Sequence, residues 1–161
     1  MSPPGGGRLA ALNLTAMHST IERFQIVDDS LATAAQPAAE HFSWLKQQGF
    51  DAVVNISTPT ARNFLRDEAT IAMAAGLDYV HAPVDCTSLD VQHYETLRGV
   101  LSAFKGKKVL VHCAGNVKAS GLMHLYRVKD LGQPAAPLRE GLRAQGWHEP
   151  KWFAYFDRMG V

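Results

Sequence analysis

One stretch of the chain decides the fold: Val109-Leu110-Val111-His112-Cys113-Ala114-Gly115-Asn116-Val117-Lys118-Ala119-Ser120-Gly121. Its opening residues, 109–112, form a short apolar run rich in valine, which predicts a buried strand. Residues 119–131 carry apolar side chains at helical spacing and are followed by Gly132, a typical helix stop. The stretch therefore predicts a cysteine between a buried strand and a helix, which is where α/β proteins place their ligands.

The rest of the chain alternates in the same way. Further strands are predicted at residues 24–27, 31–34, 52–56 and 79–84, and further helices at residues 37–48 (with Pro37 in the first turn), 66–76, 91–104, 136–144 and 150–159. Strands separated by helices predict an α/β fold whose central sheet is mostly parallel and flanked by helices. A chain of 161 residues is about one domain long, so we expect a flexible tail at residues 1–20 and a single domain at residues 21–161.

Composition excludes several classes of protein. Hydrophobic residues make up 47% of the chain and charged residues 19%, a globular balance. No apolar run approaches the ~20 residues that cross a bilayer, and residues 1–8 lack the pattern of a signal peptide. We therefore expect a cytoplasmic protein without membrane contact, although a trimmed secreted form stays open. The cysteines, Cys86 and Cys113, are too few for a disulfide scaffold, and the histidines lack metal-ligand spacing, so no metal is expected.

Charge is distributed unevenly along the chain. Residues 1–97 hold five Lys or Arg against eleven Asp or Glu, whereas residues 98–161 hold eleven against four. The basic side chains are dispersed rather than clustered, which argues against binding to nucleic acid. The net positive charge of residues 98–161 would still attract a small anionic substrate.

The residues after the strand that ends at His112 carry the chemistry. A helix N-terminus offers unpaired N–H groups and a positive dipole end, which bind a phosphate-sized anion and stabilise a thiolate. We expect Cys113 to be a nucleophile, Lys118 to add a positive charge and Ser120 to donate its hydroxyl to the sulfur. The simpler alternative, a small buried cysteine in a turn, accounts for Cys113 but not for the surrounding pattern. The expected anion-binding groups are the backbone N–H groups of Ala114, Gly115, Asn116, Val117 and Lys118.

This run, from Val111 to Ser120, resembles the phosphate-binding loop of the cysteine-dependent tyrosine and dual-specificity phosphatases. It is most similar to a bacterial family of small candidate phosphatases related to the N-terminal domain of the beta-lactamase-hydrolase-like proteins. Other segments resemble that family too, so that the resemblance covers about residues 21–132: Thr33-Ala34-Ala35-Gln36-Pro37, Gly49–Ile56, Asp67-Glu68, Gly76–Asp85 and Gly121–Val128.

The resemblance implies a dual-specificity-phosphatase-like fold and a hydrolase of phosphate monoesters that acts through a cysteinyl-phosphate intermediate. The substrate would be a phosphorylated compound, inorganic phosphate would also bind, and no cofactor is implied. His112 would hydrogen-bond around the loop. Asp85, 28 residues before Cys113, would be the general acid, with Asp90 in reserve. Each carboxylate also has a structural alternative, since Asp85 could form a loop turn and Asp90 could cap the following helix.

Two departures from the phosphatase pattern leave other functions open. The loop has four residues between Cys113 and Lys118 where tyrosine phosphatases generally have five, although the bacterial family shares the shorter loop. Lys118 stands where that family has arginine, whose planar fork binds phosphate oxygens in pairs. Turnover should therefore be weaker, and a catalytically inactive anion-binding module remains an alternative. A rhodanese-like sulfurtransferase is another, although residues 131–146 lack the strand expected after its helix. We also expect Cys86 near Cys113, either able to form a reversible disulfide or as an ordinary second thiol.

Overall fold

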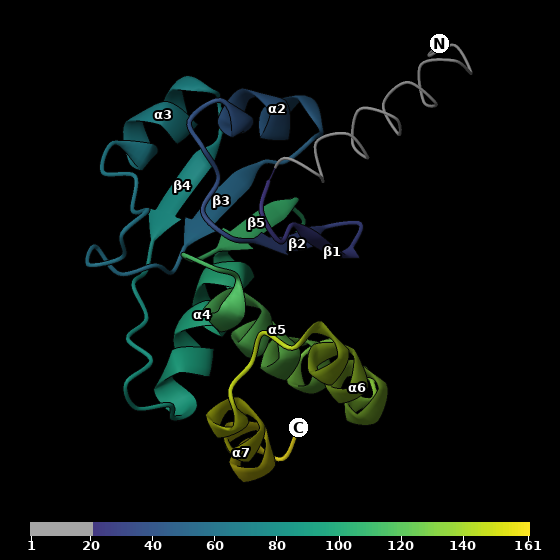
Figure 1. Ribbon diagram of the computed structural model, residues 1–161. Helices are drawn as coiled ribbons and strands as arrows, with labels where there is room; N and C mark the ends of the chain where they lie inside the picture. The colour runs from purple at the N-terminus through teal and green to yellow at the C-terminus, as the bar shows by residue number, and fades with distance from the viewer. Residues whose placement is uncertain (1–20) are drawn as a thin grey trace.

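The computed structural model describes residues 21–161, and the tail predicted at residues 1–20 lies outside the described residues. The strands are β1 (Gln25–Asp28), β2 (Leu31–Ala34), β3 (Ala52–Asn55), β4 (Asp78–His81) and β5 (Val109–His112). The helices are α2 (His41–Gln47), α3 (Glu68–Ala74), α4 (Val91–Ala103), α5 (Val117–Lys129), α6 (Ala135–Gln145) and α7 (Pro150–Met159). Strands and helices alternate as the sequence predicts, up to the helical C-terminal part (Figure 1).

The five described strands form one sheet in the order β1-β2-β5-β3-β4. Strand β5 lies in the centre and pairs in parallel with both β2 and β3, and β3 pairs in parallel with β4. Strand β1 pairs with β2 in the antiparallel sense, because the two-residue turn between them is too short for a crossover. The sheet is therefore mixed rather than purely parallel, with its antiparallel strand at one edge.

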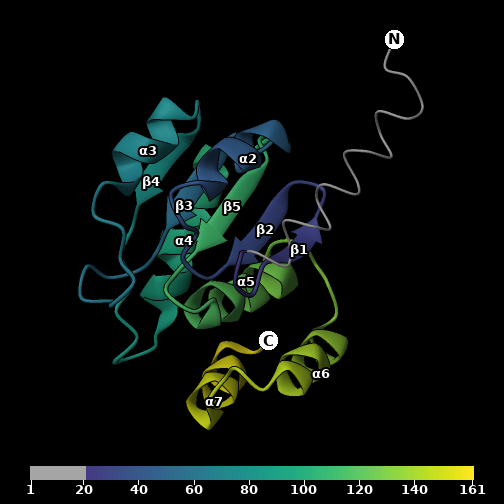
Figure 2. The same cartoon turned by 45° about the horizontal axis from the view of Figure 1, so that its top comes forward.

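Helices cover both faces of the sheet. Helices α2 and α3 lie over one face and helices α4 and α5 over the other (Figures 1 and 2). Side chains of a strand alternate between faces, so Leu110 packs in the cluster with Phe42 and Leu45 of α2, while Val109 and Val111 pack in the cluster with α4 and α5. This burial on both faces explains why β5 is continuously apolar.

Several element boundaries differ from the predictions. Pro37 is not in a helix: the N–H of Ala38 donates to Nδ1 of His41, and α2 begins only at His41. Strand β4 ends at His81 rather than at residue 84, although the N–H groups of Ala82 and Val84 still donate to the carbonyls of Asn55 and Ile56 beyond the regular register. Helix α3 begins at Glu68 rather than at residue 66.

The C-terminal helices α6 and α7 pack against α5 on the side away from the sheet (Figure 2). Gly121 of α5 permits this packing, since a Cβ atom there would overlap the ring of Trp152 from α7. No helix among residues 21–161 combines the length and the apolar character needed to cross a membrane.

Candidate active site

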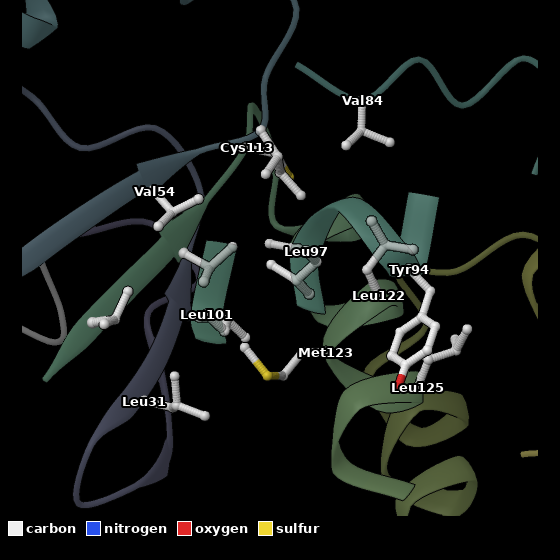
Figure 3. Close-up of a cluster of buried hydrophobic side chains, with 14 of the residues drawn as sticks. Leu31, Val54, Val84, Tyr94, Leu97, Leu101, Cys113, Leu122, Met123 and Leu125 are labelled. Carbon is white, nitrogen blue, oxygen red and sulfur yellow. The ribbon is translucent and has the colours of Figure 1, made fainter. Parts of the chain in front are cut away.

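Cys113 directly follows β5, at the carboxyl end of the central strand, as predicted. Its side chain is buried, with 1% of the residue exposed, and lies between Val54 and Val84 in the view of Figure 3. The loop then turns at Asn116, whose φ of 62° is left-handed, and α5 begins at Val117. The helix thus starts two residues earlier than predicted, and we call residues 113–118 the Cys113 loop.

Every backbone carbonyl from Ala114 to Val117 accepts a hydrogen bond from outside the Cys113 loop. The donors are Asn63 Nδ2 to Ala114 (3.0 Å), Arg23 Nη1 to Gly115 (3.0 Å), the Ser120 N–H to Asn116 (3.2 Å) and His148 Nε2 to Val117 (3.0 Å). These donors come from segments spread from residue 23 to residue 148. The carbonyl oxygens are therefore held on the outer side of the loop.

The N–H groups of the same loop have the opposite arrangement. Those of Ala114, Gly115, Val117 and Lys118 donate to no residue within 21–161, whereas that of Asn116 faces the carbonyl of Ala34 across the bridge between Ala35 and Gly115. They lie at the start of α5, where the helix dipole is positive. The loop can therefore present several backbone donors to one anion, as at other helix N-termini that bind phosphate.

A buried polar network holds His112, the residue that precedes the Cys113 loop. His112 is fully buried, and its Nε2 lies 2.5 Å from Oε2 of Glu68, which is 1% exposed. Gln36 Nε2 donates to the other oxygen of Glu68. Because both nitrogens of His112 face oxygen atoms, the ring is fixed in one orientation beneath Cys113.

Lys118 does not extend freely into the loop. Its Nζ donates to the backbone carbonyl of Val84 at 2.6 Å, so the side chain bridges the start of α5 and the segment that carries Asp85. Positive charge from Lys118 also adds to the bond from Thr87 in lowering the pKa of Asp85, and it offsets part of the rise that burial causes in the pKa of Cys86. The structure thus brings Lys118, Asp85 and Cys86 together beside the loop.

Ser120 lies in the first turns of α5, and its hydroxyl proton is directed at a carbonyl. The Oγ donates to the carbonyl oxygen of Asn116, four residues earlier, and also lies 3.1 Å from Nε2 of His148. A hydroxyl has one proton to donate. The predicted bond from Ser120 to the sulfur is therefore replaced by a bond that holds the loop.

The two candidate acids differ in their surroundings. Asp85 is exposed, and its Oδ1 accepts from the N–H of Thr87 at 3.0 Å; this bond is the main cause that lowers the pKa of Asp85. Asp90 caps α4 by accepting from the N–H of Gln92 at 3.0 Å. Asp90 is thus committed to the helix, whereas Asp85 is exposed in a loop turn.

Cys86 packs against the same hydrophobic cluster that contains Cys113, and both thiols are free. Burial raises the pKa of Cys86 to about 11, and the charge of Cys113 acts in the same direction. Cys86 is therefore a poor nucleophile beside the Cys113 loop. Within residues 21–161, no group of three His, Cys, Asp or Glu side chains is arranged to hold a metal ion.

Sequence reasoning missed several residues that hold the loop. Gln36 and Glu68 occur in segments that carry the family resemblance, but no role was assigned to them. Arg23, Asn63 and His148 gave no signal, because each lies in a turn far from Cys113 in the sequence.

Residues 23–130 match the family model described as "Beta-lactamase hydrolase-like protein, phosphatase-like domain". The chain belongs to this family. That membership confirms the family resemblance of the sequence, and the matched residues contain the sheet, the Cys113 loop and α5. No curated protein matches the chain significantly.

Solved structures of phosphatases resemble the whole phosphatase-like domain. A candidate phosphatase from Shewanella putrefaciens CN-32 is 32% identical, with a TM-score of 0.76, covering 86% of this chain and 88% of that one. TpbA of P. aeruginosa, solved also as a variant in complex with phosphotyrosine, is 20% identical with a TM-score of 0.64, covering 82% and 87%. The core catalytic domain of the PP-IP phosphatase SIW14 from S. cerevisiae is 14% identical with a TM-score of 0.69, covering 85% of each chain. The latter two likenesses concern the fold.

Proposed function

We propose that this phosphatase-like domain hydrolyses phosphate monoesters, with Cys113 as the nucleophile. The thiolate attacks phosphorus, an S–P bond forms as the ester P–O bond breaks, and the leaving oxygen takes a proton from Asp85. Water then attacks the cysteinyl phosphate, the S–P bond breaks, and inorganic phosphate leaves with the thiolate regenerated. Asp85, then a carboxylate, accepts the proton of that water.

One observation carries this proposal: the carbonyls of the Cys113 loop are bonded outward, while the N–H groups of Ala114, Gly115, Val117 and Lys118 have no partner within residues 21–161. Such donors stabilise negative charge on the phosphoryl oxygens without reorganising during the reaction. A small buried cysteine in an ordinary turn would need no such arrangement. The arrangement, together with the positive end of α5, supports both anion binding and a thiolate at Cys113.

An anion-binding module without turnover is the second candidate, and the position of Lys118 favours it. Lysine supplies a point charge rather than a paired hydrogen-bonding fork, and its Nζ is bonded to the carbonyl of Val84. Membership in a phosphatase-like family supports the phosphatase over a sulfurtransferase.

Turnover of an aryl phosphate tests the proposal. We expect the wild-type chain to hydrolyse 4-nitrophenyl phosphate and Cys113→Ser to lose activity by about a thousandfold or more, while still binding inorganic phosphate. Cys86→Ser is the matched control, since it removes the neighbouring thiol, and should retain turnover. Equal rates for wild type and Cys113→Ser on every ester, with phosphate still bound, would leave the binding module. A thiosulfate–cyanide assay beside it checks for sulfur transfer.

A further inference from the structure

Arg23 lies beside the Cys113 loop in a conformation that its residue type rarely adopts. Its φ is 51°, and within residues 21–161 only Asn116 shares a positive φ among non-glycine residues. The two residues support each other, because Nδ2 of Asn116 donates to the carbonyl of Arg23 at 2.7 Å. Left-handed backbone at a non-glycine residue persists where the surrounding structure enforces it, often at functional sites.

The side chain of Arg23 is held as firmly as its backbone. Its Nη1 donates to the carbonyl of Gly115 at 3.0 Å, and its guanidinium carbon lies 4.5 Å from the ring centroid of Trp147. Stacking occupies a face of the guanidinium and leaves the N–H groups along its edges available. Arginine has five such donors, and one of them is used by Gly115.

No carboxylate within residues 21–161 forms an ion pair with Arg23. The other basic groups next to the Cys113 loop also face backbone oxygens, since Lys118 bonds to the carbonyl of Val84 and Lys151 lies 3.4 Å from that of Cys86. An exposed arginine therefore contacts the Cys113 loop at the carbonyl of Gly115, with its charge unmatched by the described part of the chain.

We propose that Arg23 binds a second anionic group of the substrate, so that the preferred substrate is a phosphate monoester that also carries a phosphoryl or carboxylate group. The inference rests on the proposed function, because the Cys113 loop binds the phosphoryl group that reacts. Arg23 is close to the loop, since its guanidinium donates to the carbonyl of Gly115, a residue whose N–H belongs to the same loop. A small ester with two anionic groups a few bonds apart can then engage both sites.

Binding to the Cys113→Ser protein, measured by calorimetry, tests this inference. The probes are glycerol monophosphate, phosphoglycerate and glycerol bisphosphate, which add a carboxylate or a second phosphoryl group to the same three-carbon skeleton. We expect the bisphosphate to bind about tenfold more tightly than the monophosphate, as a charge-assisted hydrogen bond would give. Whether phosphoglycerate matches that gain distinguishes a carboxylate from a phosphoryl partner.

The decisive readout is the ratio of the two dissociation constants in variants. Arg23→Gln should reduce the ratio to about one or two, because a neutral amide cannot match the second charge. Arg143→Gln is the matched control: Arg143 also stacks on an aromatic ring, that of Phe153 at 4.9 Å, but is paired with Glu140. It should leave the ratio unchanged. If Arg23→Gln disturbs the whole loop, it weakens the binding of both ligands equally, and the ratio of their dissociation constants does not change.

Two results would overturn the inference: a ratio that survives Arg23→Gln, or equal reductions by Arg23→Gln and Arg143→Gln, which would indicate only the long-range field of the protein. Failure of the Cys113→Ser protein to bind inorganic phosphate would instead contradict the proposed function itself, so the two failures are distinguishable.

Discussion

Lys118 bridges the Cys113 loop and the segment after β4 through its bond to the carbonyl of Val84. Lys118→Arg should preserve or raise turnover of an aryl phosphate, because arginine adds paired hydrogen bonds to the spread charge of the transition state. Lys118→Ala should weaken phosphate binding about tenfold to a hundredfold, the range for a charged hydrogen bond.

Steady-state kinetics and phosphate inhibition constants measure both changes. Lys105→Ala, which removes an exposed lysine after α4, is the charge-matched control and should leave them unchanged. Unchanged phosphate inhibition in Lys118→Ala would show that the bond to Val84, rather than contact with the substrate, is the function of Lys118.

The buried pair of Glu68 and His112 makes a second residue-level prediction. Each group is a buried partner of the other, so Glu68→Gln and His112→Asn should each destabilise the fold, by about 3 kcal/mol. The double variant should be less destabilised than the sum of the two by about 2 kcal/mol. Urea unfolding of the three variants measures this coupling, and additive effects would argue against a direct interaction.

Sequence reasoning predicted the Cys113 loop as an anion site from contiguous residues, and the structure places those residues at the start of one helix. It could not find Arg23 or His148, since the hydrogen bonds of these residues to the loop exist only once distant segments have packed. Ser120 shows that proximity in the sequence is not enough either. Its position near Cys113 is evident from the sequence, but the acceptor of its hydroxyl proton depends on the helical geometry of α5.

At the scale of elements, the start of α5 shows why a boundary was misplaced. Helix starts are found in sequences through capping side chains, but Asn116 makes no side-chain cap and instead bonds to Arg23 and Thr33. By contrast, α4 begins where Asp90 predicts it, since that cap is local. Helix α7 also matches its prediction, with Pro150 in the first turn.

The contact between α5 and α7 leads to a prediction at this scale. Gly121→Ala should destabilise the domain by about 1–3 kcal/mol, because the added methyl group overlaps the buried ring of Trp152. Gly99→Ala in α4 is the matched control, since nothing lies within 4 Å of its added Cβ, and it should be neutral or stabilise by up to about 1 kcal/mol. Thermal unfolding of both variants measures the difference, and equal effects would refute the close approach.

For the molecule as a whole, buried histidines predict how stability depends on pH. His124 is 2% exposed and packs 4.3 Å from the ring centroid of Phe156. Burial lowers its pKa from 6.5 to about 4, although the backbone of Val161 acts in the opposite direction, and burial lowers the pKa values of His41 and His148 as well. At a pH between these two pKa values of His124, the unfolded chain binds more protons than the folded chain. The contribution of His124 to the free energy of unfolding is therefore fully present above pH 6.5 and is lost as the pH falls towards 4.

The contribution of His124 to this loss should be about 2 kcal/mol. Urea unfolding at several pH values between 7.5 and 4.5 measures it, and His124→Leu should flatten the dependence because leucine has no charge to gain. An unchanged slope in His124→Leu would assign the effect to other groups.

The architecture was predictable for a different reason from the site. Alternation of apolar strands with helices is a property of the whole chain, and it predicted a mostly parallel sheet with helices on both faces. The antiparallel edge strand β1 follows from the short turn between it and β2. What the pattern could not give is which loops meet at the carboxyl end of β5, since that depends on the strand order.

The turn between α6 and α7 limits how far the chain can be shortened from its C-terminal side. The family match ends at residue 130, yet Trp147 stacks on Arg23 and His148 holds the carbonyl of Val117, both at the Cys113 loop. The segment that matches the family model is therefore shorter than the segment whose residues hold the Cys113 loop. A fragment ending at residue 130 would keep every strand, but it would expose the α5 surface that Trp152 covers and release the loop on one side. Grafts, fusions and minimal versions of this domain should be designed to end after α7.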